Sequence, residues 1–398
     1  MVFPFLKKKK SPIWDRIHDD DSTRLRLKYD TYYPIFERQT GTRVYKDGKE
    51  YVMLSSNDYL GLSNHPKIKE AGIQALKTWG SSTTGARLAN GGRSFHRELE
   101  EALASFLGKE ACHVFSAGYL ACVSAITGFV DRKDIILADK NLHSSLWSGI
   151  KLSGAHCERF AHNQPAHLRE ILELEDANKA NAVVLEGIYS MEGHIARLPQ
   201  LLEVCKEFRS FVILDDAHGF GVLGKDGRGT ANHFELTDEI DVICGSFSKS
   251  LSGIGGFVTS SSDAIEYLRS HSKQTIFSAA LTPAACACAH AALNLLTSEP
   301  QHRERLLQNL ARYNALLEEL NLDTWNSEAP AVPIVLGEKE KVYYFWKALL
   351  EKGIYSVISI APGVPPGKDL IRTAISAAHT DEDMDKIEEG IRFAATRI

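Results

Sequence analysis

A single lysine, Lys249, follows a short apolar run and stands among four serines in the stretch CGSFSKSLSGIGGF, residues 244–257. An ammonium group at the end of a buried strand is costly to desolvate unless it is paired with an anion or made neutral. Three roles are therefore open for Lys249: a phosphate-binding cation, a nucleophile that forms a Schiff base, or an ordinary surface lysine.

Other residues that can do chemistry also come at the ends of short apolar runs. Asp215 and His218 follow FVIL, His143 follows IILAD, and Ser190 follows VVLEG. These residues have no HExxH spacing and no cysteine accompanies the histidines, so we expect no metal site. An aspartate, histidines, a lysine and hydroxyl groups suit an organic phosphate cofactor instead.

The residue before Lys249 separates two kinds of phosphate chemistry. A P-loop, GxxxxGK[ST], needs a glycine directly before its lysine, and Ser248 stands there. Pyridoxal phosphate fits better, because a lysine forms its Schiff base, an aspartate pairs with the pyridinium nitrogen, and serines with backbone N–H groups hold the phosphate. When Lys249 forms the Schiff base, its ammonium group is replaced by an imine, so the cost of burying the ammonium group no longer applies.

The elements that must position these residues alternate between helix and strand from about residue 64 to residue 290. Apolar spacing predicts amphipathic helices over 65–80, with Ile68, Ile73 and Leu76 on one face, and over 96–108 and 198–208. Four apolar runs are typical of parallel strands buried on both faces: 134–139, 181–187, 211–216 and 241–246. This order predicts a doubly wound α/β sheet with its ligand beyond the carboxyl ends of the strands.

After residue 290 the pattern changes. It predicts helices over about 300–320, 340–353 and from 380, and strands over 329–337 and 369–376, which we interpret as a smaller α+β domain. The expected organisation is an N-terminal arm (1–45), a large cofactor-binding domain (46–290) and a small C-terminal domain (291–398).

The composition excludes several classes of protein. Of the 398 residues, 44% are hydrophobic and 24% charged, which is typical of a soluble globular protein. A formal net charge of −5 gives no broad basic field, so nucleic acid is not an expected partner. The seven scattered cysteines, without CxxC pairs, fit a reducing cytoplasm.

The chain resembles the α-oxoamine synthases, a family of fold type I pyridoxal-phosphate enzymes, over nearly its whole length from about Tyr33. Eight collinear stretches carry the resemblance: SSNDYLGL (55–62), GSSTTGARLANGGRSFHRELEEALASFLG (80–108), FSAGYL (115–120), EGIYSMEG (186–193), DDAHGFGVLGKDGRG (215–229), GSFSKSLSGIGGF (245–257), FSAALTPA (277–284) and LIRTAISAAHT (370–380). The resemblance implies a homodimer with active sites at the subunit interface.

The resemblance also implies a catalytic role for four residues. Lys249 would be the Schiff-base lysine, and Asp215 the partner of the pyridinium nitrogen. His218 would contact the phenolic oxygen of the cofactor, and His143 would stack on its face.

Further residues would bind the cofactor phosphate or the substrate. Backbone N–H groups of Gly118 and Tyr119 would hold the phosphate with the Ser246 and Ser248 hydroxyls. Ser278 would reach the phosphate of the neighbouring subunit. Ser190 is a further cofactor-binding candidate, Arg372 would bind the substrate carboxylate, and Asn57 is a further substrate-binding candidate.

Two stretches indicate which reaction to expect. SFSKSLSGIGGF and APGVPPGKDLIRTAISAAHT resemble bacterial serine palmitoyltransferases, whereas 8-amino-7-oxononanoate synthases usually show PPTVP at the second stretch. The resemblance thus implies an acyltransferase that condenses L-serine with a long-chain acyl thioester (palmitoyl-CoA), with loss of carbon dioxide. The product would be 3-ketodihydrosphingosine, at the first step of sphingolipid synthesis.

Three alternatives stay open. One is an 8-amino-7-oxononanoate synthase of the biotin pathway, which joins alanine to a pimeloyl thioester. Another is a quorum-signal α-amino ketone synthase with a shorter acyl chain. The third is a catalytically silent partner subunit, which Lys249 disfavours because such subunits lack the Schiff-base lysine. CoA and acyl carrier protein both stay open as the thioester carrier.

Residues 1–10, MVFPFLKKKK, have their basic run after a few apolar residues, unlike a signal peptide or a spanning helix. One interpretation is a solvated terminus. The other is a weak anchor in which Phe3, Phe5 and Leu6 enter a bilayer and four lysines meet anionic head groups. The expected location is cytoplasmic, with peripheral contact at the inner membrane under the second interpretation.

Overall fold

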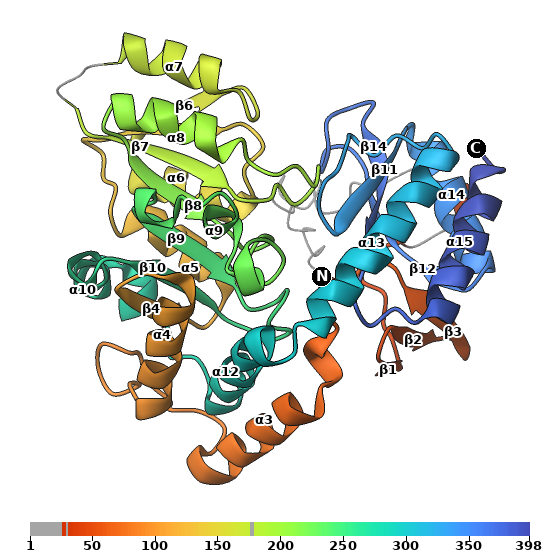
Figure 1. Cartoon of the computed structure of the whole chain (residues 1–398), viewed down its shortest axis with the longest axis horizontal. Helices are drawn as coiled ribbons and strands as arrows, with labels where there is room; N and C mark the ends of the chain where they lie inside the picture. Colours follow the sequence, from red (N-terminus) through yellow and green to blue (C-terminus); the bar gives the residue numbers. More distant parts are fainter. Residues whose placement is uncertain (1–25, 29–30, 176–178) are drawn as a thin grey trace, which may run out of the picture.

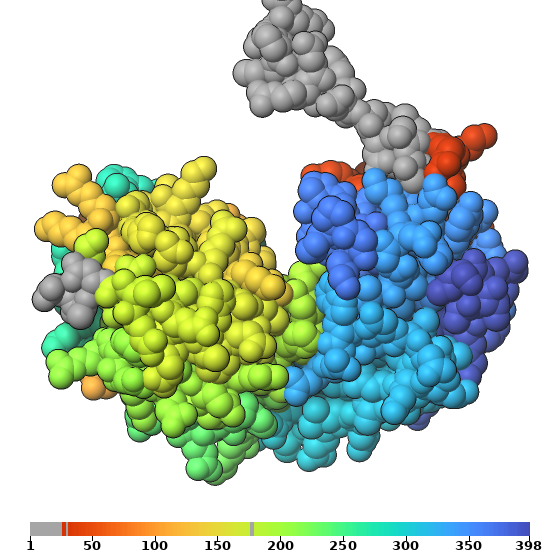
Figure 2. All heavy atoms as spheres, turned by 90° about the horizontal axis from the view of Figure 1, so that it is seen from above, coloured from red at the N-terminus to blue at the C-terminus, as the bar shows by residue number. Residues whose placement is uncertain are grey.

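The computed structural model describes residues 26–28, 31–175 and 179–398, so the expectations for residues 1–10 lie outside the described residues. Two lobes stand side by side (Figure 1). A space-filling view from above shows a hollow between them (Figure 2). Among the described residues, no helix has both the length and the apolar character needed to cross a bilayer.

The larger lobe is built on a seven-stranded sheet of order β4-β10-β9-β8-β7-β5-β6. The five strands from β6 to β9 along this order are parallel, and β10 runs antiparallel to both of its neighbours. The bounds are β4 Ala111–Phe115, β5 Ile135–Asp139, β6 His156–Phe160, β7 Asn181–Glu186, β8 Phe211–Asp215, β9 Val242–Ser246 and β10 Gly256–Ser260. The four predicted strands correspond to β5, β7, β8 and β9, and the α/β sheet, mainly parallel, is confirmed.

Three strands of this sheet were not predicted, each for a local reason. Strand β6 is an edge strand of sequence HCERF with little apolar character. Strand β4 carries a buried histidine in ACHVF, and β10 begins with a glycine in GFVTS. Short strands of this kind are specified by the neighbours that pair with them more than by their own pattern.

Helices cover the sheet of the larger lobe (Figure 1). Of these, α5 packs on β9 and β10, and α7 packs on β6 and α8. The bounds are α3 Pro66–Trp79, α4 Ser94–Leu107, α5 Gly118–Thr127, α6 Ser144–Ser153, α7 Pro165–Leu174, α8 Leu198–Glu207, α9 Thr230–His233, α10 Ser262–His271, α11 Lys273–Ile276 and α12 Pro283–Ser298, with 3-10 turns η1 Leu62–Asn64, η2 Lys225–Gly227 and η3 Thr237–Glu239.

The first helix expected from the sequence is present, but its apolar face is not all buried. Helix α3 starts with Pro66 after the His65 cap and stops at Gly80, whose φ of 76° suits a glycine. Ile68 is buried, whereas Ile73 and Leu76 are about half exposed. The spacing therefore predicted the helix correctly, but it did not predict which apolar side chains the lobe would cover.

The smaller lobe combines the strands of residues 38–53 with the C-terminal part of the chain. Its three-stranded sheet has the order β11-β14-β13, and a second sheet has the order β1-β2-β3-β12. In the second sheet β3 runs parallel to β12, with Val52 opposite Ile354. The bounds are β1 Arg38–Thr40, β2 Arg43–Lys46, β3 Lys49–Met53, α13 Gln301–Glu319, β11 Ala331–Gly337, α14 Lys339–Glu351, β12 Ile354–Tyr355, β13 Val357–Ser359, β14 Asp369–Ala374 and α15 Asp381–Ala395.

The helices α13, α14 and α15 and the strands β11 and β14 match the predictions for the C-terminal part. The proposed boundary between residues 45 and 46 falls inside β2, before its last residue, and β2 lies in one sheet with β3 and β12. The division into an arm and two domains therefore remains a proposal.

Candidate functional site

A cavity of about 290 Å³ lies at the carboxyl ends of β7, β8 and β9, where the doubly wound sheet was expected to bind its ligand. Eight of the residues predicted from the sequence line it: Gly118, Tyr119, His143, Asp215, His218, Ser246, Ser248 and Lys249. A larger hollow of about 800 Å³, lined mainly by residues 162–164, 194–200 and 325–328, contains none of the predicted residues. We therefore consider the smaller cavity the candidate site.

One end of the cavity is suited to an anion. Helix α5 begins at Gly118 with no side chain capping its first turn, so backbone N–H groups remain for a ligand. A Cβ at Gly118 would overlap the Ser246 side chain, so glycine is what lets the helix start approach β9. The Ser246 and Ser248 hydroxyls lie 2.8 Å apart beside it. This donor set fits a phosphate.

Asp215, the last residue of β8, fits a cationic ring nitrogen. Its carboxylate is buried, and it accepts the Ala217 N–H at Oδ1 (3.0 Å) and the Cys122 thiol at Oδ2 (3.1 Å). The salt bridges among the described residues include none to Asp215. A buried carboxylate with only neutral partners is costly, and a cation bound in the cavity offsets that cost.

His143 caps helix α6 at the other side of the cavity. Its Nδ1 accepts the Ser145 N–H (3.3 Å) and lies 2.7 Å from the Ser145 hydroxyl. The His143 ring is open to the cavity, but desolvation by the surrounding protein still lowers its pKa. The Asp215 carboxylate raises this pKa and Lys249 lowers it, and the net shift is downward. The ring is thus neutral near pH 7 and suited to stacking.

Glu186, at the end of β7, lies behind His143. Its carboxyl accepts the His143 backbone N–H, and complete burial together with Asp215 raises its pKa well above the usual value. The raised pKa favours the protonated, neutral form of Glu186, in which no second negative charge lies beside Asp215.

His218 is fixed by a tyrosine. Its Nδ1 lies 2.7 Å from the Tyr59 hydroxyl, and burial, followed by the charge of Lys249, lowers the pKa of His218 well below the usual value. Burial raises the pKa of Tyr59 to about 12, so the phenol keeps its proton. If Tyr59 donates to Nδ1, the Nε2–H of His218 is left to donate to an oxygen in the cavity.

Lys249 sits in the turn that follows β9. The turn is closed by the Ser252 N–H, which donates to the Lys249 carbonyl (2.9 Å), and Ser252 takes a positive φ of 50°. The Ser252 hydroxyl donates to Asp58 Oδ1 (2.5 Å), so the segment that carries Asn57 and Tyr59 supports the strained turn.

Three further predicted residues meet beside the cavity. Arg372, from β14 of the smaller lobe, donates from Nη2 to Asn57 Oδ1 (3.2 Å) and from Nε to the Ser190 carbonyl (3.3 Å). Both partners are neutral, and the described residues show no salt bridge to Arg372. Its charge acts on His143 and His218 in the cavity, which fits a role in holding an anionic substrate group.

Ser278 does not line the cavity of this chain. It follows Phe277, which is 81% exposed, and precedes Ala279, which pairs with Ala86. The proposed contact of Ser278 with a neighbouring subunit remains a prediction.

The sequence alone did not indicate several residues of the site. Cys122 and Ser145 line the cavity, and Tyr59 supports it from behind. Cys122 lies four residues after Gly118, so the helical repeat puts both on one face of α5, and this spacing could have indicated it. Tyr59 lies two residues after Asn57, but only the fold shows that it contacts His218.

The chain matches the aminotransferase class I and II family over residues 49–391. It is 37% identical to an 8-amino-7-oxononanoate synthase of Thermoanaerobacter pseudethanolicus, covering 88% of this chain and 89% of that protein. It is 38% identical to a serine palmitoyltransferase of Sphingobacterium spiritivorum, covering 91% and 90%. A solved serine palmitoyltransferase with a pyridoxal phosphate internal aldimine superposes with a TM-score of 0.91 at 31% identity, covering 94% and 97%.

Proposed function

Because this chain belongs to the aminotransferase class I and II family and its relatives are α-oxoamine synthases, we propose that it condenses L-serine with a long-chain acyl thioester and releases carbon dioxide. The fold is fold type I of the pyridoxal-phosphate-dependent enzymes, and the activity is that of an acyltransferase. The proposed product is a 3-keto sphingoid base. With palmitoyl-CoA as the acyl thioester, this product is 3-ketodihydrosphingosine.

The observation that carries the proposal is the set of residues around one cavity. A lysine, a carboxylate without a cationic partner and an uncapped helix start with two serines line the same 290 Å³. When bound, pyridoxal phosphate supplies an aldehyde for an amine and an electron-withdrawing ring next to the substrate α-carbon. The phosphate fits at Gly118, Ser246 and Ser248, and the ring nitrogen fits at Asp215.

Lys249 is the residue that we expect to move the α-proton. Its amine lies in the same cavity as Asp215 and His143, and its turn is fixed through Ser252 and Asp58. A fixed amine close to the α-carbon can take up that proton as a general base. His143 lines the same cavity, and we expect it to hold the carboxylate that leaves as carbon dioxide.

Arg372 is the proposed anchor for the amino acid carboxylate. Its guanidinium already spends two donors on Asn57 and on the Ser190 carbonyl, so its direction is fixed. A guanidinium has five donors, and those that remain can pair with a carboxylate.

An 8-amino-7-oxononanoate synthase is the second candidate function. The observation in its favour is the identity of 37% to such an enzyme, which is nearly equal to the 38% identity to a serine palmitoyltransferase. We favour L-serine because APGVPPG stands at residues 361–367, where the synthases usually show PPTVP.

The deciding experiment is an activity assay on the full-length protein loaded with pyridoxal phosphate. L-serine, L-alanine and glycine are each combined with pimeloyl, octanoyl and palmitoyl thioesters of CoA and of acyl carrier protein, and products are identified by mass. We expect the serine and palmitoyl pair to give the highest kcat/KM. A preference for alanine with the pimeloyl thioester would establish the second candidate instead. A protein without a visible cofactor absorption band would instead be a silent partner subunit.

A further inference from the structure

Asp215 is held on its inner side by a thiol. Cys122 Sγ donates to Asp215 Oδ2 over 3.1 Å, and both residues line the cavity. Thiols are weak donors compared with hydroxyls and amides. The contact with Cys122 therefore fixes the direction of the Asp215 carboxylate. Because the donor is weak, the negative charge of the carboxylate stays available to a cation in the cavity.

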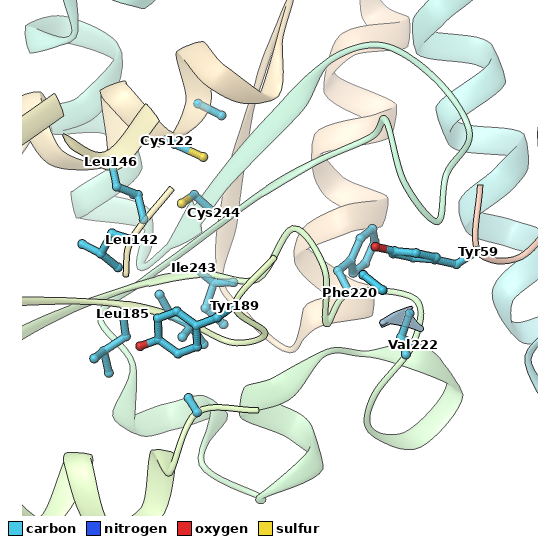
Figure 3. Close-up of a cluster of buried hydrophobic side chains, with 14 of the residues drawn as sticks. Tyr59, Cys122, Leu142, Leu146, Leu185, Tyr189, Phe220, Val222, Ile243 and Cys244 are labelled. Carbon is cyan, nitrogen blue, oxygen red and sulfur yellow. The ribbon is translucent and has the colours of Figure 1, made fainter. Parts of the chain in front are cut away.

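A second cysteine stands behind the first. Cys244 is fully buried in β9 and pairs across the sheet with Asp215 of β8. The two sulfur atoms and an Asp215 oxygen all lie within 4.8 Å of one another, and the sulfurs face each other (Figure 3). A layer of buried apolar side chains, including Leu142, Leu146 and Ile243, lies around this pair (Figure 3).

Both thiols keep their protons. The Cys244 thiol lowers the pKa of Cys122, but burial and the Asp215 carboxylate outweigh it and raise that pKa overall. The contact with Cys122 and burial raise the pKa of Cys244 well above the usual value. Cys122 is therefore available as a donor to Asp215 throughout the neutral pH range.

The two cysteines also connect the two ends of the cavity. Cys122 comes four residues after Gly118 on α5, which is a rise of about 6 Å along a helix. Cys244 comes two residues before Ser246 on β9, which is about 6.6 Å along a strand. The same two elements therefore set both the phosphate end and the carboxylate end of the site.

We propose that Cys122 is the positioning residue for Asp215, and that Cys244 keeps water away from their contact. The inference rests on the proposed function, because it assigns Asp215 to the ring nitrogen of bound pyridoxal phosphate. Cys122 then acts through Asp215 and does not touch the reacting atoms.

The test compares Cys122→Ala and Cys122→Ser with Cys205→Ala, a control at another buried cysteine that lies on α8 and outside the cavity lining. Three measurements are made on the full-length protein: the Kd of pyridoxal phosphate by absorbance titration, the pH midpoint of the visible band of the bound cofactor, and steady-state kinetics that give kcat and the KM for the amino acid. We expect Cys122→Ala to weaken cofactor binding about fivefold, as expected for one lost hydrogen bond, and to shift the midpoint. It should lower kcat with little change in the KM for the amino acid, and Cys122→Ser should restore binding.

The proposal is overturned if Cys122→Ala matches Cys205→Ala in cofactor Kd, pH midpoint and kcat. If Cys122→Ala does not fold, Cys122→Ser is compared with the wild type. A hydroxyl is a stronger donor than a thiol, so the proposal predicts a shifted pH midpoint for Cys122→Ser. An unchanged pH midpoint overturns the proposal. A wild-type protein without any visible band contradicts the proposed function itself, whereas a wild-type band that does not respond to Cys122 contradicts only this inference.

Discussion

At the scale of single residues, the site contains two charged side chains whose hydrogen-bond partners among the described residues are all neutral. Asp215 contacts a backbone N–H and a thiol, and Arg372 contacts an amide oxygen and a carbonyl. Buried or half-buried charges without a counter-ion are expensive, so their retention points to ligands that bring the opposite charge. The proposed ligand of Asp215 is a ring cation, and that of Arg372 is a carboxylate.

Replacing Lys249 tests the nucleophile. Lys249→Ala should abolish turnover, because no other amine lines the cavity of the described chain, while the fold and part of the cofactor affinity persist through the phosphate contacts. Turnover, the visible absorption band and the melting temperature are measured beside Lys273→Ala, which removes an exposed lysine on α11. Turnover above a trace in Lys249→Ala would refute the assignment.

Replacing Arg372 tests the carboxylate anchor. Arg372→Ala should raise the KM for the amino acid by about ten- to a hundredfold and leave the KM for the thioester nearly unchanged, because a charge-assisted contact is lost. Steady-state kinetics with both substrates measure this. Arg305→Ala, which removes a surface partner of Asp381 in the same lobe, serves as the control. Equal effects on both KM values would give Arg372 a structural role.

The residues of the site were predictable to different degrees, and the reason is physical. Lys249, Asp215, His143 and the serines could be found because they end apolar strands, and strand ends meet at one edge of a parallel sheet. The spacing from Gly118 could have indicated Cys122 as a site residue, but its contact with Asp215 was not predictable, because that contact depends on how α5 packs across β8 and β9.

At the scale of elements, helix α4 supports the loop before it through one buried carboxylate. Arg87 donates to Glu100 from both terminal nitrogens (2.8 and 3.0 Å), and His113 lies 3.1 Å from the same carboxylate. Burial alone would raise the pKa of Glu100, but His113 and Arg87 outweigh it and lower this pKa to about 2. Glu100 thus ties residues 80–92 to β4.

The lowered pKa predicts how the contribution of Glu100 depends on pH. A carboxyl with a pKa near 2 in the folded state and 4.5 otherwise stabilises fully above pH 4.5 and loses this effect as the pH falls toward 2. Glu100→Gln should therefore cost about 3 kcal/mol at pH 7 and clearly less at pH 3. Urea unfolding at pH 7, 5 and 3 measures the difference, with Glu98→Gln as the exposed control on the same helix. A cost that does not change with pH would contradict the prediction.

The elements themselves were predictable where their pattern was periodic. The long helices α13, α14 and α15 and the four apolar strands match the prediction, because their burial repeats along the chain. The direction of β10 was not predictable, since a short strand takes its direction from the strands beside it, here β4 and β9. The pairing of β3 with β12 joins distant segments and leaves no local pattern.

At the scale of the whole molecule, the proposed homodimer makes each site depend on two chains. Ser278 lies outside the cavity of its own chain, next to the exposed Phe277. If Ser278 serves the neighbouring site, a mixed dimer of Lys249→Ala and Ser278→Ala subunits contains one complete site.

Mixing these two variants should raise activity above the sum of the separate variants at limiting cofactor. The matched control is a mixture of Lys249→Ala with Asp215→Ala, in which every site lacks one of the two proposed catalytic residues. Activity and the dimer fraction by light scattering are measured after co-expression with two tags. No gain in the first mixture, at a demonstrated dimer fraction, would place Ser278 outside the neighbour's site.

The pairing of β3 with β12 also bears on how the chain is made. Val52 leaves the ribosome about 300 residues before its partner Ile354, which corresponds to about 15 to 60 s of synthesis. During that time the sheet of the larger lobe, whose strands all lie between residues 111 and 260, can already form. The edge of β3 stays open over the same interval and is a surface that other strands can join. A nascent chain stalled before residue 354 is therefore a natural substrate for chaperones, although Lys249, the proposed Schiff-base lysine, has already been translated.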